Sequence, residues 1–434
     1  MVVARQPEPR RDVACPFCGL ACDDLVVATA GGRAEVRANG CALGVAGFAR
    51  PTGASGPRVD GRETDLAGAA TRAAEILAAS RLPLFAGLGT DVAGMRAVMR
   101  LAERVGGVVD HLGSDGLFRN LRAIQDGGWV ATTLSEVRNR ADVLLVVGPD
   151  PSAAFPRFAE RCLTVAETLF TDGPLRRRLF RLGPPAADGF AATLLPCRLD
   201  SLPEAVAVLR ALVNDRPVAA AEGGGVPIAA LRELAAALKA AAYGVVAWAA
   251  AGLDDAGGAL AVQAVVDLVR DLNRTTRCAG LPLTGADNLI GVNQVCTWQS
   301  GFPLRTGFGR GFPEHDAYLF SAQRLLESGE ADALVWISAF RPLPPPARDI
   351  STVVLAAPET RPALASPEAS PRRAPPAAVF VPVGTPGIDH EGQVFRTDGV
   401  VALPLGRLVE RGLPSVAAVL TRIDEALARR GPAT

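Results

Sequence analysis

The chain has 434 residues, of which 49% are apolar and 21% charged, a balance typical of soluble globular domains with large cores. Its 45 basic and 45 acidic side chains cancel, so the sequence offers no overall attraction to nucleic acid or an anionic membrane. The N-terminus lacks the apolar run of a secretory signal, and the apolar stretch 243–253 is too short to span a bilayer. We therefore expect a cytoplasmic protein whose eight cysteines are thiols or metal ligands rather than disulfides.

The first half of the sequence predicts helices that alternate with strongly apolar strands. Residues 1–60 are the exception, because Gly, Cys and charged residues dominate there and a metal would help so small a segment to fold. The elements predicted next are a helix that begins at Thr64 or Asp65, a strand within 82–89, a helix within 92–106 that ends on Gly106, a helix near 116–125 and a strand within 141–151. Near-continuous apolar strands between helices indicate parallel βαβ units.

The second half repeats this alternation. Its predicted elements are a helix at 228–241, a strand within 242–251, an amphipathic helix at 256–274, strands within 332–340 and 350–358, and a final helix from Ser415 to Arg430. The proline-dense stretch 341–378 is typical of surface loops or a connector. The sequence therefore predicts an α/β protein with a small Cys-rich domain at 1–60 and two α/β domains, at 61–215 and 216–434.

Four cysteines near the N-terminus form the sharpest motif of the sequence. Their spacing is C-x2-C-x3-C-x18-C, and they are Cys15, Cys18, Cys22 and Cys41. Three thiols from one loop and a fourth from a neighbouring turn can bind the four corners of a cubane [4Fe–4S] cluster. Zinc is the alternative metal, although structural zinc sites more often use two C-x2-C pairs or mixed Cys and His ligands. Four metal-free thiols are the remaining alternative, because the sequence also carries four isolated cysteines.

The segment 15–44 resembles the N-terminal cluster loop of the B subunit of formylmethanofuran dehydrogenases, within the wider molybdopterin oxidoreductase family. Three further blocks, at 132–158, 291–313 and 381–400, resemble the same subunit in the same order. The resemblance implies the large-subunit fold of that family, with parallel sheets like those of the first three domains of formate dehydrogenase and without the C-terminal β-barrel that holds a pterin. It also favours a [4Fe–4S] cluster on the four cysteines.

The same resemblance reveals a missing metal ligand. In the active family a Cys or selenocysteine that binds molybdenum or tungsten precedes a helix whose counterpart here ends near Gln125. Between Asp110 and Trp129 this sequence has no cysteine, and its nearest oxygen donors are Ser114 and Asp115. Those two residues equally suit the N-cap of the helix that follows. We therefore expect no catalytic residue and no Mo/W-pterin in this chain, and we expect the Ser114–Gly116 loop in a cleft at the carboxyl ends of parallel strands.

Two functions follow from the resemblance. The first is the B subunit of the bacterial formyltransferase/hydrolase complex, which takes part in the tetrahydromethanopterin-linked oxidation of formaldehyde to formate in one-carbon metabolism. There the chain would be a non-redox scaffold for partners that resemble an amidohydrolase, a formyltransferase and the C subunit of the dehydrogenase. The second is an active Mo/W-pterin formylmethanofuran dehydrogenase subunit with a [4Fe–4S] cluster. The missing Cys favours the first, and the stretches 341–378 and 296–312 are the expected partner surfaces.

Overall fold

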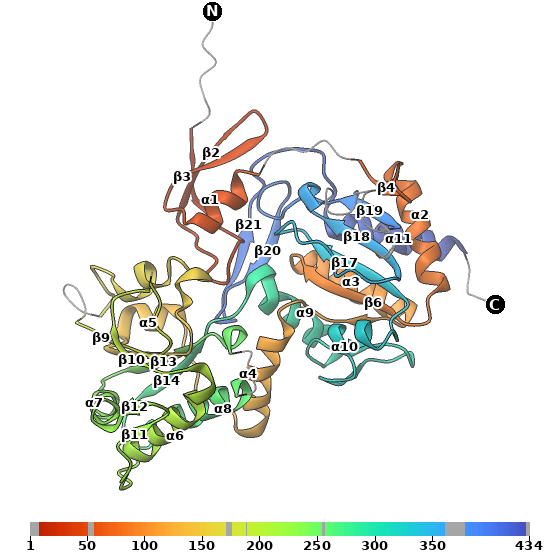
Figure 1. The fold of residues 1–434 in the computed structure, drawn as a ribbon. Coiled ribbons are helices and arrows are strands. Elements are labelled where there is room, and N and C mark those ends of the chain that lie inside the picture. Colours follow the sequence, from red (N-terminus) through yellow and green to blue (C-terminus); the bar gives the residue numbers. More distant parts are fainter. Residues whose placement is uncertain are drawn as a thin grey trace, which may run out of the picture. The chain divides into compact units, whose positions relative to one another are not determined.

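The computed structural model describes residues 8–50, 56–170, 176–187, 189–253, 257–360 and 378–430. The chain forms two compact units, one made of residues 1–114 and 285–434 and the other of residues 115–284. Figure 1 shows the two units with the chain coloured along the sequence. No helix in the described part of the chain is long and apolar enough to cross a membrane.

The first unit is built on a mixed nine-stranded sheet. Its strands are, in spatial order, β16 (Glu314–His315), β15 (Thr306–Gly307), β7 (Val108–Val109), β6 (Pro83–Gly89), β17 (Ala333–Ser338), β18 (Ser351–Ala356), β19 (Val379–Pro382), β4 (Arg58–Val59) and β5 (Arg62–Glu63). The five central strands, from β7 to β19, run parallel. All seven residues of β6 and all six of β17 are buried, which explains their continuous apolar sequences.

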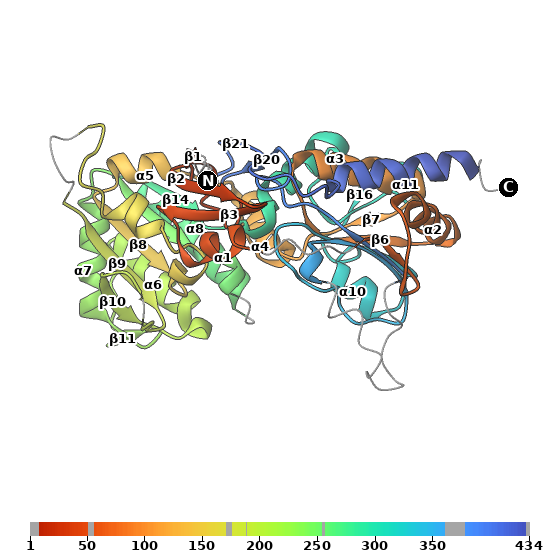
Figure 2. The ribbon, with the colours of Figure 1, turned by 90° about the horizontal axis from the view of Figure 1, so that it is seen from above.

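Helices cover both faces of this sheet. They are α2 (Leu66–Ala79), α3 (Val92–Val105), α9 (Leu289–Ser300), α10 (Ala322–Glu327) and α11 (Val416–Arg430). Figure 2 shows α3 and α11 on one face of the sheet and α10 on the other. Local sequence sets the ends of these helices: the carboxylate of Asp65 accepts from Gly68 N, that of Asp91 accepts from Gly94 N, and Gly106 ends α3 with φ 67°.

Two smaller pieces complete the first unit. The Cys-rich piece consists of a three-stranded antiparallel sheet, β1 (Arg10–Val13), β2 (Leu25–Ala30) and β3 (Arg33–Ala38), followed by α1 (Ala42–Phe48). The hairpin β20 (Gly392–Phe395) and β21 (Ala402–Leu405) follows the last strand of the large sheet. After this hairpin the chain enters α11, the predicted C-terminal helix.

The second unit is a parallel α/β layer. Its strands are, in spatial order, β10 (Thr193–Pro196), β9 (Arg178–Gly183), β8 (Val143–Val147), β13 (Gly244–Trp248) and β14 (Cys278–Pro282), and all neighbours are parallel. Its longer helices are α4 (Ser114–Gly127), α5 (Leu134–Arg140), α6 (Leu202–Val213), α7 (Ile228–Lys239) and α8 (Gly258–Leu272), and it also has a short hairpin, β11 (Glu222–Gly223) and β12 (Val226–Pro227). The predicted parallel α/β class is therefore confirmed.

The contacts divide the chain differently from the three consecutive domains expected at 1–60, 61–215 and 216–434. Strand β6 pairs with β17, so the first and last parts of the chain share one sheet. Strand β8 pairs with β13 across the expected boundary at 215. The physical reason is that each sheet completes its hydrogen bonding with strands distant in sequence, and the second unit is inserted between β7 and α9 of the first.

Candidate metal centre

A closed loop holds three of the four predicted metal ligands. The amide of Cys15 donates to the carbonyl of Cys22 at 2.7 Å, and the amide of Ala21 donates to the carbonyl of Cys18 at 3.1 Å. Ala21 has φ 44°, a left-handed conformation that turns the chain between the second and third cysteines. The short C-x2-C-x3-C spacing therefore folds as one tight loop, with Cys15 and Cys22 buried and Cys18 partly exposed.

The fourth cysteine reaches this loop from the start of α1. Cys41 is the N-cap residue of that helix, and its carbonyl accepts from Val45 N at 2.8 Å. A Cβ placed on Gly44 would lie 3.4 Å from Cys15 Sγ and 3.9 Å from Cys41 Sγ, so both sulphur atoms lie within 4 Å of one point. Cys41 is therefore brought beside Cys15 although 25 residues intervene in the sequence.

The surroundings of the thiols disfavour metal-free thiolates. Burial is the main cause that raises the pKa of Cys15, and Cys18, Cys22 and Cys41 raise it further. Burial likewise raises the pKa of Cys18 to about 12, with smaller contributions from Cys22 and Cys41. A bound cation would offset this cost, because metal ligation favours the deprotonated thiol.

A cluster and a single ion make different demands on the positions of the four thiols. Within the described residues, no group of three or more His, Cys, Asp or Glu side chains is placed to hold one metal ion. Tetrahedral zinc needs its sulphur ligands at about 2.3 Å from one centre, whereas a cubane accepts one thiolate at each of four separated corners. The [4Fe–4S] cluster expected on the four cysteines stays a prediction.

The segment expected to carry the other metal ligand follows the carboxyl end of β7. Asp110 accepts from the amides of His111 at 2.9 Å and Ala322 at 2.8 Å, and its carboxylate lies 3.4 Å from Arg305 Nε. Ser114 is 1% exposed, and its hydroxyl accepts from His111 N at 3.2 Å. The segment thus lies at the carboxyl edge of the parallel sheet, as predicted.

His111 is also fully engaged within the protein. Its Nδ1 accepts from Gly113 N at 2.9 Å, and its Nε2 lies 3.3 Å from the carbonyl oxygen of Asp287, to which it can donate. The side chain of Asp287 is 1% exposed and forms a salt bridge with Arg341. Burial lowers the pKa of His111 to about 4, although Asp287 opposes this shift, so the imidazole is neutral near neutral pH.

Asp115 lies at the surface of the protein. It is an exposed residue in the first turn of α4, with Ser114 at the first helical position. An acidic residue there interacts favourably with the helix dipole. Of the two oxygen donors proposed from the sequence, Ser114 is therefore buried and hydrogen-bonded, and Asp115 is at the surface. The placement of the Ser114–Gly116 loop in a cleft stays a prediction.

A buried ionic cluster at the carboxyl edge of the first unit was missed by sequence reasoning. It includes the salt bridges Asp287–Arg341 and Asp389–Arg411. Burial lowers the pKa of the nearby Arg50, and Glu359 and Asp287 oppose that shift. Its members are separated by up to several hundred residues in sequence. No motif joins them, so only the folded chain brings them together.

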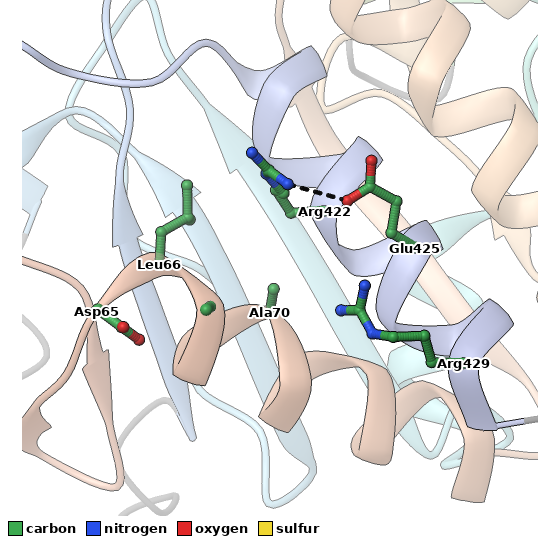
Figure 3. A pocket seen from close by; sticks show the side chains of 7 residues that line it. Asp65, Leu66, Ala70, Arg422, Glu425 and Arg429 are labelled. Atoms are coloured by element: carbon green, nitrogen blue, oxygen red, sulfur yellow. Dashed lines mark hydrogen bonds and ion pairs between the residues drawn. The ribbon is translucent and has the colours of Figure 1, made fainter.

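Two surface grooves of the first unit lie away from these residues. One, of about 410 Å³, lies between the start of α2 and the C-terminal part of α11. Figure 3 shows Asp65 and Leu66 on one side of it and Arg422, paired with Glu425, on the other. The second, of about 590 Å³, lies between the start of α3 and the hairpin β20–β21. Neither groove is lined by a cysteine.

Comparisons with known proteins agree with this architecture. No protein-family model matches the sequence. The chain is 30% identical over 405 residues to the B subunit of the tungsten-containing formylmethanofuran dehydrogenase 2 of Methanocaldococcus jannaschii, covering 90% of this chain and 92% of that one. It is 31% identical over 379 residues to the B subunit of the formyltransferase/hydrolase complex Fhc of Methylorubrum extorquens, covering 86% and 98%.

Comparison with solved structures also finds the formyltransferase/hydrolase complex. The crystal structure of the formyltransferase/hydrolase complex FhcABCD from Methylorubrum extorquens with methylofuran contains a chain that matches with a TM-score of 0.72 at 29% identity, covering 87% of this chain and 100% of that one. Acetylene hydratase from Pelobacter acetylenicus matches with a TM-score of 0.60 at 11% identity, covering 96% and 69%, which shows the fold alone.

The fold therefore defines a class of parallel α/β subunits that includes the matching chain of the formyltransferase/hydrolase complex. Within that class, the chain belongs to the family of formylmethanofuran dehydrogenase B subunits, to which the B subunit of the formyltransferase/hydrolase complex is also related.

Tungsten, which the name of the archaeal relative implies, does not fit residues 110–114. The carboxylate of Asp110, both ring nitrogens of His111 and the hydroxyl of Ser114 all have partners within the protein. A tungsten ligand there would compete with these buried hydrogen bonds, and a buried polar group left unpaired costs about 1–3 kcal/mol. The segment also contains no thiol, so its residues do not reproduce the tungsten site that the family resemblance implies.

Proposed function

We propose that the chain is the B subunit of a formyltransferase/hydrolase complex and acts there as a non-redox scaffold. Its partners would be the other chains of that complex, which resemble an amidohydrolase, a formyltransferase and the C subunit of the dehydrogenase and which move a formyl group toward formate. The match along 98% of the bacterial subunit supports this assignment. The observation that carries the scaffold role is the segment 110–114, which contains no thiol and whose polar side chains are hydrogen-bonded within the protein.

The cofactor we propose is a [4Fe–4S] cluster on the four cysteines, without Mo/W-pterin. The closed loop from Cys15 to Cys22 and the approach of Cys41 to Cys15 support this part of the proposal. Eight cysteines that serve as thiols or metal ligands suit the reducing cytoplasm, the compartment we propose for the complex.

The test is metal analysis together with turnover of the reconstituted complex. We expect about four iron atoms per chain and no stoichiometric molybdenum or tungsten. Asp115→Ala should leave formyl transfer and hydrolysis near the rate of the unmodified complex, because this exposed residue would not contact the reacting groups.

Glu136→Ala is a suitable control, since Glu136 is likewise an acidic residue in the first turn of a helix, α5. Stoichiometric tungsten, or loss of turnover in an assembled Asp115→Ala complex but not in the Glu136→Ala complex, would instead support an active formylmethanofuran dehydrogenase subunit.

A further inference from the structure

The cysteine loop is packed against parts of the first unit that are distant in sequence. Ala21, between the second and third cysteines, belongs to a buried apolar cluster with Phe340, Val394 and Leu405. Phe340 lies just beyond the end of β17, and the other two residues come from β20 and β21. The loop therefore contributes directly to the packing between the hairpin and the large sheet.

Backbone hydrogen bonds strengthen the same connection. The amide of Thr397, in the turn of the β20–β21 hairpin, donates to the carbonyl of Gly19 at 2.7 Å. On the other side of the loop, Arg10 Nη1 donates to the carbonyl of Arg407 at 2.7 Å. The hairpin is thus held by residues that flank or lie within the cysteine loop, and a change in loop geometry would move its partners.

The aromatic ring within the first C-x2-C pair extends the contact to the buried ionic cluster. Phe17 packs edge-on against Phe48 at 5.3 Å, and the Arg50 guanidinium lies 5.2 Å from its ring centre. A Cβ on Gly47 would come within 2.4 Å of this ring, so α1 needs a glycine there to approach the loop. Arg50 in turn interacts electrostatically with Glu359 and Asp287.

The Cys-rich piece has few apolar residues of its own to hold this arrangement. Its buried apolar side chains, apart from the cysteines, are Phe17, Leu20, Ala21, Leu25, Val27, Ala34 and Phe48. So small a core rarely stabilises a segment without a metal or another cross-link. A metal bound to cysteines from the loop and from α1 would join the two parts and reduce the conformational freedom of the metal-free chain.

We propose that the metal bound by the four cysteines acts as a structural clamp that fixes the hairpin β20–β21 and the end of β17, and does not serve as an electron relay. This inference rests on the proposed function, in which the four cysteines bind a metal cluster. The clamp acts through Ala21, Gly19 and Phe17, which lie between the metal ligands and contact the rest of the first unit. The segment 110–114 supports a structural role, because it contains no thiol and its polar side chains are hydrogen-bonded within the protein.

The test uses the complete complex, purified without oxygen, and hydrogen exchange measured by mass spectrometry before and after a chelator removes the metal. Metal removal should speed exchange about tenfold or more in residues 392–405 and 336–340, because local opening there becomes easier. Exchange in β8 and β13 of the second unit should not change. Faster exchange confined to residues 14–24 would overturn the clamp while leaving the proposed metal intact.

A matched pair of variants gives a second measurement. Cys15→Ser should reproduce the faster exchange of the hairpin, whereas Cys162→Ser should not, although Cys15 and Cys162 are about equally buried, at 5% and 4% exposure. A complex that contains no iron or zinc as purified would contradict both the proposed metal binding and the proposed clamp. A cluster whose electron paramagnetic resonance signal changes in step with turnover would overturn the clamp in favour of an electron relay.

Discussion

His111 illustrates how one buried side chain can make stability depend on pH. Its Nδ1 accepts from Gly113 N, so protonation at this nitrogen would place two donors against each other. Burial is the main reason that its pKa falls from 6.5 to about 4. The neutral form is therefore favoured in the folded chain, and stability from this residue is complete above the unfolded pKa and is lost as pH falls toward the folded pKa.

We predict that the free energy of unfolding decreases by about 2 kcal/mol between about pH 7 and pH 5 because of His111, since the unfolded chain binds a proton in that range and the folded chain does not. His111→Gln should remove this part of the pH dependence in urea unfolding. His315→Gln is the control, because His315 is partly exposed and stacks on Phe302. An unchanged pH dependence in His111→Gln would contradict the assignment of a buried neutral imidazole.

At the scale of elements, close packing fixes the start of α4, the helix that begins where the family resemblance places a metal ligand. A Cβ on Gly116 would lie 2.9 Å from both the amide nitrogen and Cα of Ala251, which follows β13. Further along α4, Asn120 accepts from Trp248 Nε1 at 2.8 Å, and Arg119 donates to the carbonyl of Ala250 at 2.9 Å. The helix is therefore positioned against the carboxyl end of β13 by close backbone contact.

We predict that Gly116→Ala lowers the free energy of unfolding by about 1–3 kcal/mol, because the added methyl group meets backbone atoms that cannot move freely. Chemical unfolding of the isolated chain or of the complex would measure this change. Gly406→Ala should be nearly neutral, since nothing lies within 4 Å of a Cβ at that position. Equal stability of the two variants would show that α4 can shift away from β13.

The molecule as a whole presents exposed aromatic residues in the segment 298–319. They are Trp298, Phe302, Phe312 and Tyr318, accompanied by Leu319. This segment overlaps the partner surface expected at 296–312, although Cys296 itself is buried. The other expected surface, 341–378, lies partly outside the described residues, from 361 to 377. Exposed aromatic side chains are enriched at subunit interfaces, where their burial stabilises assembly.

We predict that Trp298→Ala weakens assembly of the complex about tenfold or more, because a large aromatic residue at an interface often contributes over about 1 kcal/mol. Trp298 is 63% exposed and also packs against Phe395, with ring centres 5.7 Å apart. Leu260→Ala is the control, because Leu260 is 65% exposed and lies in α8 of the second unit. Sedimentation of complexes mixed from purified subunits would measure the effect, and equal assembly by both variants would remove this segment from the interface.

The sequence by itself determined the local elements of this protein. Apolar runs became β6, β8, β13 and β17, and the cap residues Asp65 and Gly106 mark helix ends where they were expected. The short strands β7 and β15, of two residues each, left no sequence signal. Helix caps and strand periodicity arise from interactions between near neighbours, so a single sequence contains them.

Only the tertiary structure decided which strands pair and what surrounds the candidate sites. The ring of His111 contacts the carbonyl oxygen of Asp287 although 176 positions separate the two residues. The amide of Thr397 likewise donates to the carbonyl of Gly19, which lies near the other end of the sequence. The spacing of the cysteines predicted a shared site, yet the approach of Cys41 to Cys15 depends on how α1 packs on the loop. Such contacts depend on the packing of whole elements, which maximises buried apolar area and hydrogen bonding over the entire fold, and no local pattern of residues encodes them.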